Sequence, residues 1–72
     1  MTQYQNVNGN SGVSAFSFGQ DYIDVQFDTG KVYRYSYRSA GYMKVEEMKR
    51  LAFQGWGLNS YIMRNAYGDY EK

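Results

Sequence analysis

Tyrosine occupies every second position of segment 32–37, as Tyr33, Tyr35 and Tyr37, directly after the turn-like sequence Asp-Thr-Gly at 28–30. Successive side chains of a β-strand point to opposite faces, so this spacing places the three rings on one face as a ladder. A tyrosine ring packs well in a core and also stacks well on a ligand, while its hydroxyl needs a hydrogen-bond partner. The face taken by the ladder therefore decides whether this strand serves the core or a binding surface.

The length of the turn sets that face, because the preceding segment 22–27 alternates Ile, Val and Phe with Asp and Gln as a half-buried strand does. A two-residue loop pairs Phe27 with Val32 and turns the tyrosines toward the polar side of segment 22–27. A three-residue loop pairs Phe27 with Lys31 and turns them toward its apolar side. We favour the three-residue loop, since Gly30 then takes the left-handed position that ends a type I turn with a G1 bulge. The first two tyrosines would then lie largely in the core.

The composition limits both the stability and the chemistry of the chain. Its 72 residues make one domain, near the lower size for a core without disulfides or metal. The chain has no Cys and no His, which removes the usual zinc ligands, the thiolate nucleophile and the neutral-pH proton shuttle. Nine Tyr, four Phe and one Trp supply the apolar area instead. We therefore expect a protein that is not an enzyme, with no catalytic residue, no metal site and no cofactor.

Charge and hydropathy narrow the choice of partner. Eight basic and seven acidic side chains give a net charge of +1, which disfavours a protein that coats long duplexes by neutralising many phosphates. A short single strand, a small nucleotide or a protein surface remains compatible with this balance. No apolar run approaches the roughly twenty residues that cross a bilayer, and the N-terminus lacks the order of a signal peptide. We expect a soluble protein that stays in the compartment where it is made.

The order of elements predicts the architecture. Residues 1–12 are dominated by Gln, Asn, Gly, Ser and Thr and are expected to form a flexible polar tail, followed by a single domain at 13–72. Segment 13–18 is expected to be a short strand whose apolar pattern shifts phase between Ala15 and Phe16, and a turn at 19–21 separates it from segment 22–27. The sequence thus predicts an α+β fold, a three-stranded antiparallel meander followed by two helices packed on one face.

Two helices are expected after the third strand. Ser39 is a reasonable N-cap for the first, which runs to about Gln54. Its apolar stripe is formed by Val45, Met48, Leu51 and Ala52. Glycines at 55 and 57 stop this helix, and Asn59 or Ser60 can cap the second. The apolar stripe of the second helix is formed by Leu58, Tyr61, Ile62 and Ala66, and Gly68 ends it.

The order of several short elements resembles the KTSC domain, which is named from the C-terminus of some lysyl-tRNA synthetases and also occurs free-standing in bacteria and phages. The similarity spans about residues 11–64, and its most typical element is the central Tyr-x-Tyr. The matching runs are Ser11-Gly12-Val13-Ser14-Ala15-Phe16, Ile23-Asp24-Val25-Gln26-Phe27 with Gly30, Val32-Tyr33-Arg34-Tyr35, and Gly55 with Leu58-Asn59-Ser60-Tyr61-Ile62. The resemblance implies a cytoplasmic protein of a bacterium or a phage-infected bacterium. It also implies a link to RNA, which has been suggested for the family without being established, and it carries over no catalytic residue.

Eight side chains are candidates for ligand contact, and each also has a structural explanation. The tyrosine ladder can stack nucleobases while Arg34 or Arg38 contacts phosphate, or its first two members can be core residues. Trp56 is either an exposed stacking residue or a filler between the helices. Asn59 begins the second helix, where it either caps the backbone or binds an anion together with Arg64. The candidate ligand-binding residues are Tyr33, Arg34, Tyr35, Tyr37, Arg38, Trp56, Asn59 and Arg64.

Two functions from different classes follow from these residues. The first is a non-enzymatic binding domain for nucleobase-containing ligands, either short RNA or a small nucleotide, held by aromatic stacking and a few arginines. The alternative is an inhibitor of the phage or mobile-element type that blocks a host protein, with the same aromatic side chains as interface anchors. A domain that works as a homodimer is a third arrangement. The C-terminal Tyr67, Tyr70 and Lys72 either fray or pack back on the sheet.

Overall fold

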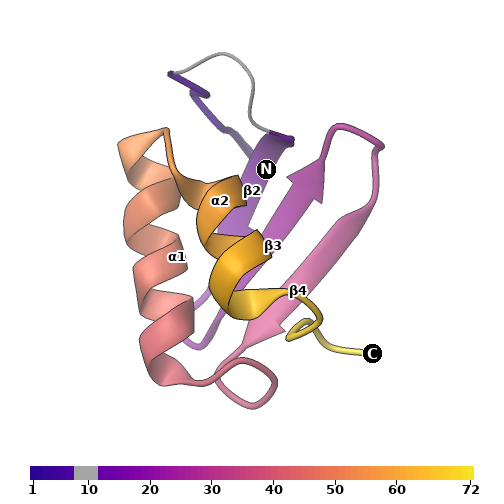
Figure 1. Cartoon of the computed structure of the whole chain (residues 1–72), viewed down its shortest axis with the longest axis vertical. Helices are drawn as coiled ribbons and strands as arrows, with labels where there is room; N and C mark the ends of the chain where they lie inside the picture. Colours follow the sequence, from indigo (N-terminus) through magenta and orange to yellow (C-terminus); the bar gives the residue numbers. More distant parts are fainter. Residues whose placement is uncertain (8–11) are drawn as a thin grey trace.

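The computed structural model describes residues 1–7 and 12–72 and shows an α+β fold of two layers (Figure 1). One layer is an antiparallel sheet with the strand order β1-β2-β3-β4, and the helices cover one face of it. The expected meander is thus extended by one further strand at its N-terminal edge. The strands are β1 (Thr2–Gln3), β2 (Val13–Phe18), β3 (Tyr22–Phe27) and β4 (Val32–Ser36).

The β3–β4 turn has three residues, as predicted. The Phe27 amide donates to the Lys31 carbonyl at 2.9 Å, and the Gly30 amide donates back to the Phe27 carbonyl at 2.8 Å. Gly30 has a φ of 92°, a left-handed conformation that glycine adopts without a Cβ penalty. In this register Tyr33 pairs with Val25 and Tyr35 with Ile23, so both tyrosines lie on the helix-facing side of the sheet.

A β-bulge explains the broken alternation in β2. Val13 pairs with Phe27, whereas Ala15 pairs with Gln26, so Ser14 is the extra residue of the bulged strand. The Ser14 hydroxyl donates to the Gln26 carbonyl at 3.3 Å. The phase shift that the sequence indicated is present, but it lies one to two residues earlier than the Ala15–Phe16 step.

The first residues of the segment predicted to be a flexible polar tail, 1–12, are paired with the sheet and packed against the core. Strand β1 pairs with β2, and the Tyr4 amide donates to the Ser14 carbonyl at 3.0 Å. The Tyr4 side chain is only 2% exposed, because its ring enters the core and offsets the entropy of ordering the segment. Val7 is the only aliphatic residue of this segment after Met1, but the aromatic ring of Tyr4 supplies apolar area as well. The part of the predicted tail at 8–11 lies outside the described residues.

The first helix, α1 (Tyr42–Gln54), begins later than expected. Its N-cap is Gly41, and no side chain bonds its free amides. Ser39 therefore does not cap α1. Its hydroxyl instead accepts the Ser36 amide at 3.0 Å and closes the β4–α1 turn. At the other end Gly55 is the left-handed C-cap, as the sequence predicted.

The second helix has two parts with different winding. It begins as α2 (Leu58–Tyr61) and continues directly as a π-helical turn, η1 (Ile62–Ala66). Its N-cap is Gly57 without a side-chain hydrogen bond, so the prediction that Asn59 or Ser60 caps this helix is wrong. None of the helices in residues 1–7 and 12–72 is long and apolar enough to span a bilayer.

The core lies between the sheet and the helices. The predicted apolar stripe of α1 is buried in full, as are three of the four predicted residues of the second helix. The remaining one, Tyr61, packs against the core while partly exposed. The buried hydrophobic residues are Tyr4, Val13, Phe16, Ile23, Val25, Tyr35, Val45, Met48, Leu51, Ala52, Leu58, Ile62 and Ala66.

Candidate ligand-binding cleft

An aromatic cleft of about 310 Å³ lies between the β3–β4 hairpin and the end of the second helix. This volume is at the lower end of the range for small-molecule sites. Among the residues that the structure describes, no charged side chain lines the cleft, so its walls suit a flat, uncharged ring. We call it the aromatic cleft; its lining residues are Phe27, Thr29, Tyr33, Tyr35, Ile62, Met63, Tyr67, Gly68 and Tyr70.

The hairpin register positions the rings of the cleft. Tyr33 lies with its ring centroid 5.7 Å from that of Phe27 and 4.6 Å from that of Tyr70. The Tyr70 ring also meets Tyr35 edge to face at 6.2 Å. Offset and edge-to-face contacts of this kind are the favourable arrangements of aromatic pairs. They hold the walls in place without a ligand.

The C-terminal segment, residues 67–72, forms one side of the cleft. The Lys44 ammonium contacts the Asp69 carboxylate at 2.8 Å, and the Glu71 amide donates to the Arg34 carbonyl at 2.7 Å. Gly68, with a φ of 85°, lets the chain leave the second helix and turn back toward β4. The segment therefore packs back on the sheet, one of the two alternatives that the sequence left open.

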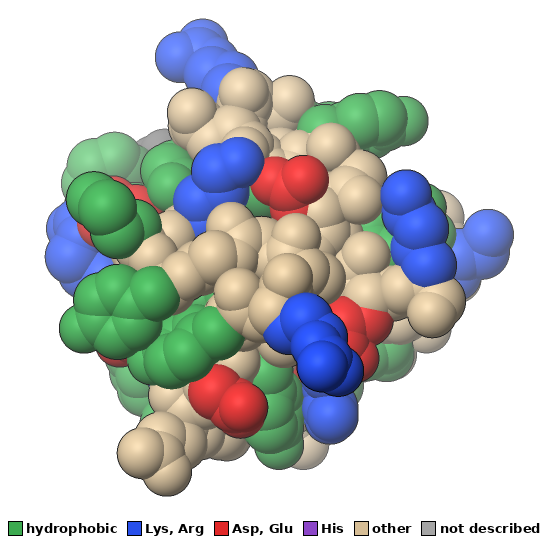
Figure 2. Space-filling model, turned by 90° about the horizontal axis from the view of Figure 1, so that it is seen from below, with side chains coloured by type: hydrophobic (Ala, Val, Ile, Leu, Met, Phe, Trp, Pro, Cys, Tyr) green, Lys and Arg blue, Asp and Glu red, His purple; other side chains and the backbone are tan. Residues whose placement is uncertain are grey.

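A second, polar hollow of about 480 Å³ adjoins the aromatic cleft and shares Gly68 and Tyr70 with it. Its cations are Arg38 and Lys72, and its acidic residues are Asp69, which pairs with Lys44, and Glu71. We call it the polar hollow; it is lined by Arg38, Ser39, Gly68, Asp69, Tyr70, Glu71 and Lys72. Figure 2 views the molecule from below relative to Figure 1, and it shows basic and acidic side chains scattered over this face among hydrophobic ones.

Of the predicted site residues, Tyr33 lines the aromatic cleft and Arg38 the polar hollow. Tyr35 also borders the cleft, but it is only 2% exposed, and burial raises the pKa of its hydroxyl to about 12. A ring so enclosed cannot stack face to face on a ligand. Tyr35 is therefore a core residue that supports the cleft, which is the alternative that the three-residue turn favoured, and it does not serve as a stacking residue.

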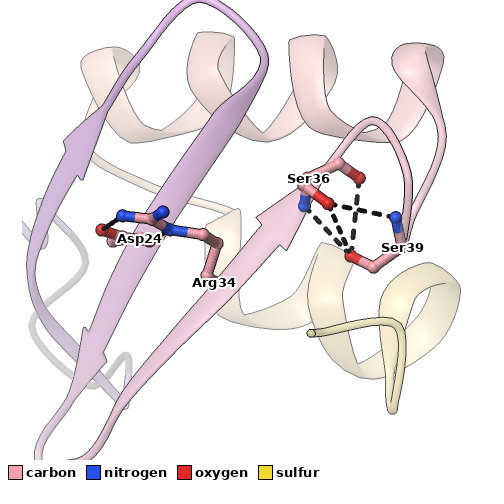
Figure 3. Close-up of polar contacts among 4 residues, drawn as sticks. All are labelled: Asp24, Arg34, Ser36 and Ser39. Atoms are coloured by element: carbon pink, nitrogen blue, oxygen red, sulfur yellow. Dashed lines mark hydrogen bonds and ion pairs between the residues drawn. The ribbon is translucent and has the colours of Figure 1, made fainter. Parts of the chain in front are cut away.

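Arg34 points away from the cleft, because its place in the strand alternation puts it on the opposite face of the sheet. Its guanidinium forms two hydrogen bonds with the Asp24 carboxylate, at 2.7 and 2.9 Å (Figure 3). The guanidinium carbon also lies 3.9 Å from the centre of the Tyr22 ring. The bonds with Asp24 raise the pKa of Arg34 above its ordinary value. Of the two arginines predicted to contact the phosphate of a base stacked on Tyr33, Arg34 lies on the opposite face of the sheet and cannot do so.

Tyr37 supports the β4–α1 turn. Its hydroxyl donates to the Glu46 carboxylate at 2.6 Å, and its ring meets that of Tyr42 edge to face at 5.1 Å. The hydrogen bond raises the pKa of Tyr37 to about 12 and, together with Lys49, lowers that of Glu46. Tyr37 lines neither the aromatic cleft nor the polar hollow.

The other three predicted residues lie away from both cavities. Trp56 is 49% exposed in the α1–α2 connection, at the opposite end of the molecule from the β4–α1 turn (Figure 1). Asn59 lies in α2 beside Gly12, and Arg64 is exposed on η1. The eight predicted residues therefore do not form one site.

Sequence reasoning missed the residues that close the cleft from the C-terminal side. Met63, Tyr67 and Tyr70 come from the helix end and the segment after it, which local patterns do not place relative to the sheet. The available signal was the pair of tyrosines just before and after Gly68 in a segment with no helical period. This signal indicated that the two rings pack, but it did not identify the segment against which they pack.

Comparison with known proteins adds no assignment. No family model, no curated protein and no solved structure matches the chain significantly. The resemblance to the KTSC domain stays a prediction from the residues. Within residues 1–7 and 12–72 no group of three or more acidic, His or Cys side chains could hold a metal ion.

Proposed function

We propose that this protein is a non-enzymatic binding domain for a small nucleobase-containing ligand. The observation that carries the proposal is the contact between the two cavities, since an uncharged aromatic cleft opens beside a hollow that contains Arg38 and Lys72. A base stacks between aromatic rings, while cations favour phosphate oxygens. The base is placed in the aromatic cleft, against Tyr33, Tyr67 and Tyr70, and the phosphate in the polar hollow.

The size and charge of the site favour a mononucleotide or a short RNA over a long strand. Each stacked base contributes about 1–3 kcal/mol, and the cleft has room for few rings. The two cations of the hollow lie among carboxylates, so the total phosphate contribution is small. Adenosine is therefore expected to retain much of the affinity of its monophosphate.

A titration of the labelled protein with adenosine and with its monophosphate, followed by amide NMR, tests this proposal. Tyr67→Ser is expected to weaken binding by about tenfold, the loss of one stacked ring. Tyr42→Ser is the matched control, because Tyr42 is 63% exposed, comparable to 77% for Tyr67, but lines neither cavity. Equal effects of the two substitutions, or no shifts near the cleft, would reject the proposal.

A second candidate is the inhibitor that blocks a host protein, and one surface favours it. Phe18 and Phe53 are each about half exposed, with ring centroids 5.1 Å apart beside the β2 end of the sheet. Exposed aromatic pairs are typical interface anchors. Phe53→Ser is expected to abolish capture of such a partner while leaving adenosine binding unchanged. A salt titration separates the two functions, because phosphate contacts weaken with salt and an apolar interface changes little.

A further inference from the structure

Strand β4 is the last strand of the sheet, and its backbone shows which groups face outward. Hydrogen bonds of an antiparallel pair alternate along the strand, and those from Phe27 to Lys31 and from Tyr37 to Asp21 set the alternation. The odd-numbered residues of β4 therefore bond to β3. The N–H and C=O groups of Val32, Arg34 and Ser36 point to the open edge.

The chain itself bonds both outward groups of Ser36 and one outward group of Arg34. The Ser36 amide and carbonyl both bond to Ser39, which closes the edge at that end (Figure 3). The Arg34 carbonyl accepts the Glu71 amide. Within residues 1–7 and 12–72, the Arg34 N–H and both outward groups of Val32 have no protein partner. The edge is therefore only partly paired, and proteins normally protect such an edge.

The chain's own C-terminal segment shows what chemistry fits this edge. A backbone N–H from Glu71 reaches Arg34, the ring of Tyr70 lies on Tyr33, and the carboxylate of Asp69 lies 2.8 Å from the Lys44 ammonium. These contacts are single and partly exposed, so each contributes little to holding the segment in place. A longer extended peptide with the same order of groups would make the same contacts and also bond the free groups of Val32.

We propose that the β4 edge binds, by strand addition, an extended peptide in which an aromatic residue follows a carboxylate, and that residues 69–72 are its internal competitor. Main-chain hydrogen bonds supply the affinity in this mode, and pockets for alternate side chains supply the selectivity. The acidic residue of the peptide pairs with Lys44, and its aromatic ring takes the place of Tyr70 against Tyr33. This partner is a protein segment, distinct from the nucleobase ligand proposed above.

The test uses the full chain carrying Asp69→Asn and Tyr70→Ser, which release the internal competitor and replace no buried core residue. The probe is a capped peptide, Thr-Thr-Asp-Tyr-Glu-Thr-Thr, because threonine favours strands. The matched control is the same peptide with the Glu nitrogen methylated, which removes one donor and keeps every side chain. Amide NMR of the labelled protein follows Val32, Tyr33 and Arg34, and its signal dispersion verifies the fold.

The expected result is a set of shifts along β4, with at least about tenfold tighter binding to the substituted chain than to the unsubstituted one. Methylation is expected to weaken binding by about tenfold or more, since a strand edge needs that donor. Equal binding of both peptides, or shifts that avoid β4, would overturn the inference. Adenosine titrated into the unsubstituted chain reports separately on the proposed function, so either idea can fail alone.

Discussion

The hydroxyl oxygen of Tyr4 accepts the backbone amide of Leu58 at 3.2 Å, across 54 positions of the sequence. Leu58 is the first residue of α2, whose N-cap Gly57 provides no side-chain acceptor. The tyrosine from the N-terminal segment thus satisfies one of the free amides at the start of this helix. Both residues are buried, so this contact ties the N-terminal segment, at the residue after β1, to the second helix inside the core.

Two substitutions at Tyr4 are expected to separate its hydroxyl from its ring. Tyr4→Phe keeps the ring but leaves the buried Leu58 amide without its acceptor, and should lower the free energy of unfolding by about 1–3 kcal/mol. Tyr4→Ala also opens a cavity, and should cost about 3–5 kcal/mol. Urea unfolding followed by circular dichroism measures both. A loss below 0.5 kcal/mol for Tyr4→Ala, about the size of a surface substitution, would show that the N-terminal segment does not contribute to the core.

Gly55 and Gly30 form a matched pair, because they have nearly the same φ, 90° and 92°. A Cβ at Gly55 would lie 2.8 Å from the Cβ of Gln5, whereas nothing lies within 4 Å of one at Gly30. Gly30→Ala should cost about 1 kcal/mol from backbone strain alone. Gly55→Ala should cost at least 1 kcal/mol more, because the N-terminal segment must shift. Thermal unfolding compares them, and equal losses would contradict the close approach.

Arginines 34 and 38 are expected to respond differently in ligand binding, although both follow a tyrosine of the ladder. Arg38→Ala should weaken the binding of adenosine monophosphate, since Arg38 lines the polar hollow, and should leave adenosine binding unchanged. Arg34→Ala should affect neither ligand, because its guanidinium pairs with Asp24 on the other face of the sheet. Calorimetric titration of both ligands measures this. A larger effect at Arg34 would place the phosphate on the wrong face for our proposal.

Stability is expected to fall at high pH because of Tyr35 and Tyr37, and the buried Tyr35 isolates one part of this decline. Its pKa is raised to about 12 in the folded protein, whereas an unfolded tyrosine ionises near 10. The native state therefore keeps the proton longer, and the contribution is fully present below pH 10 and lost as the pH rises toward 12. Tyr35→Phe should flatten this decline. Urea unfolding between pH 8 and 11.5 checks the slope, and an unchanged slope in the variant would contradict the burial of this hydroxyl.

Glu46 is expected to contribute to the pH dependence of stability in the acidic range. Its pKa is lowered in the folded protein, first by the hydrogen bond from Tyr37 and then by that from Lys49. The stabilisation is present above the unfolded value near 4.3 and is lost as the pH falls through the lower folded value. Glu46→Gln and Tyr37→Phe should each flatten the acid limb of the stability profile. Their effects should be less than additive in the double variant, since both remove the same bond.

Local sequence patterns correctly predicted those features in which a side chain's environment follows from its neighbours in the chain. The alternation of segment 22–27 and the glycine at position 30 predicted the three-residue turn, and with it the helix-facing side of Tyr33 and Tyr35. The three- and four-residue spacing after the turn predicted the buried stripe of α1. These features depend on the period of apolar residues or on the left-handed φ that glycine adopts readily, and both can be recognised in the sequence.

The remaining features depend on contacts between distant segments, and only the tertiary structure decided them. Tyr4 lies in a polar segment, and its buried hydroxyl has a partner because the Leu58 amide of α2, 54 residues away, donates to it. Strand alternation places Arg34 on the face of the sheet opposite Tyr33. Its interaction partners on that face, Asp24 and Tyr22, come from the neighbouring strand. The aromatic cleft exists because the C-terminal segment turns back onto β4. The sequence by itself determined the elements and their apolar faces, since these arise from local geometry. The site arises from long-range packing, which no local pattern encodes.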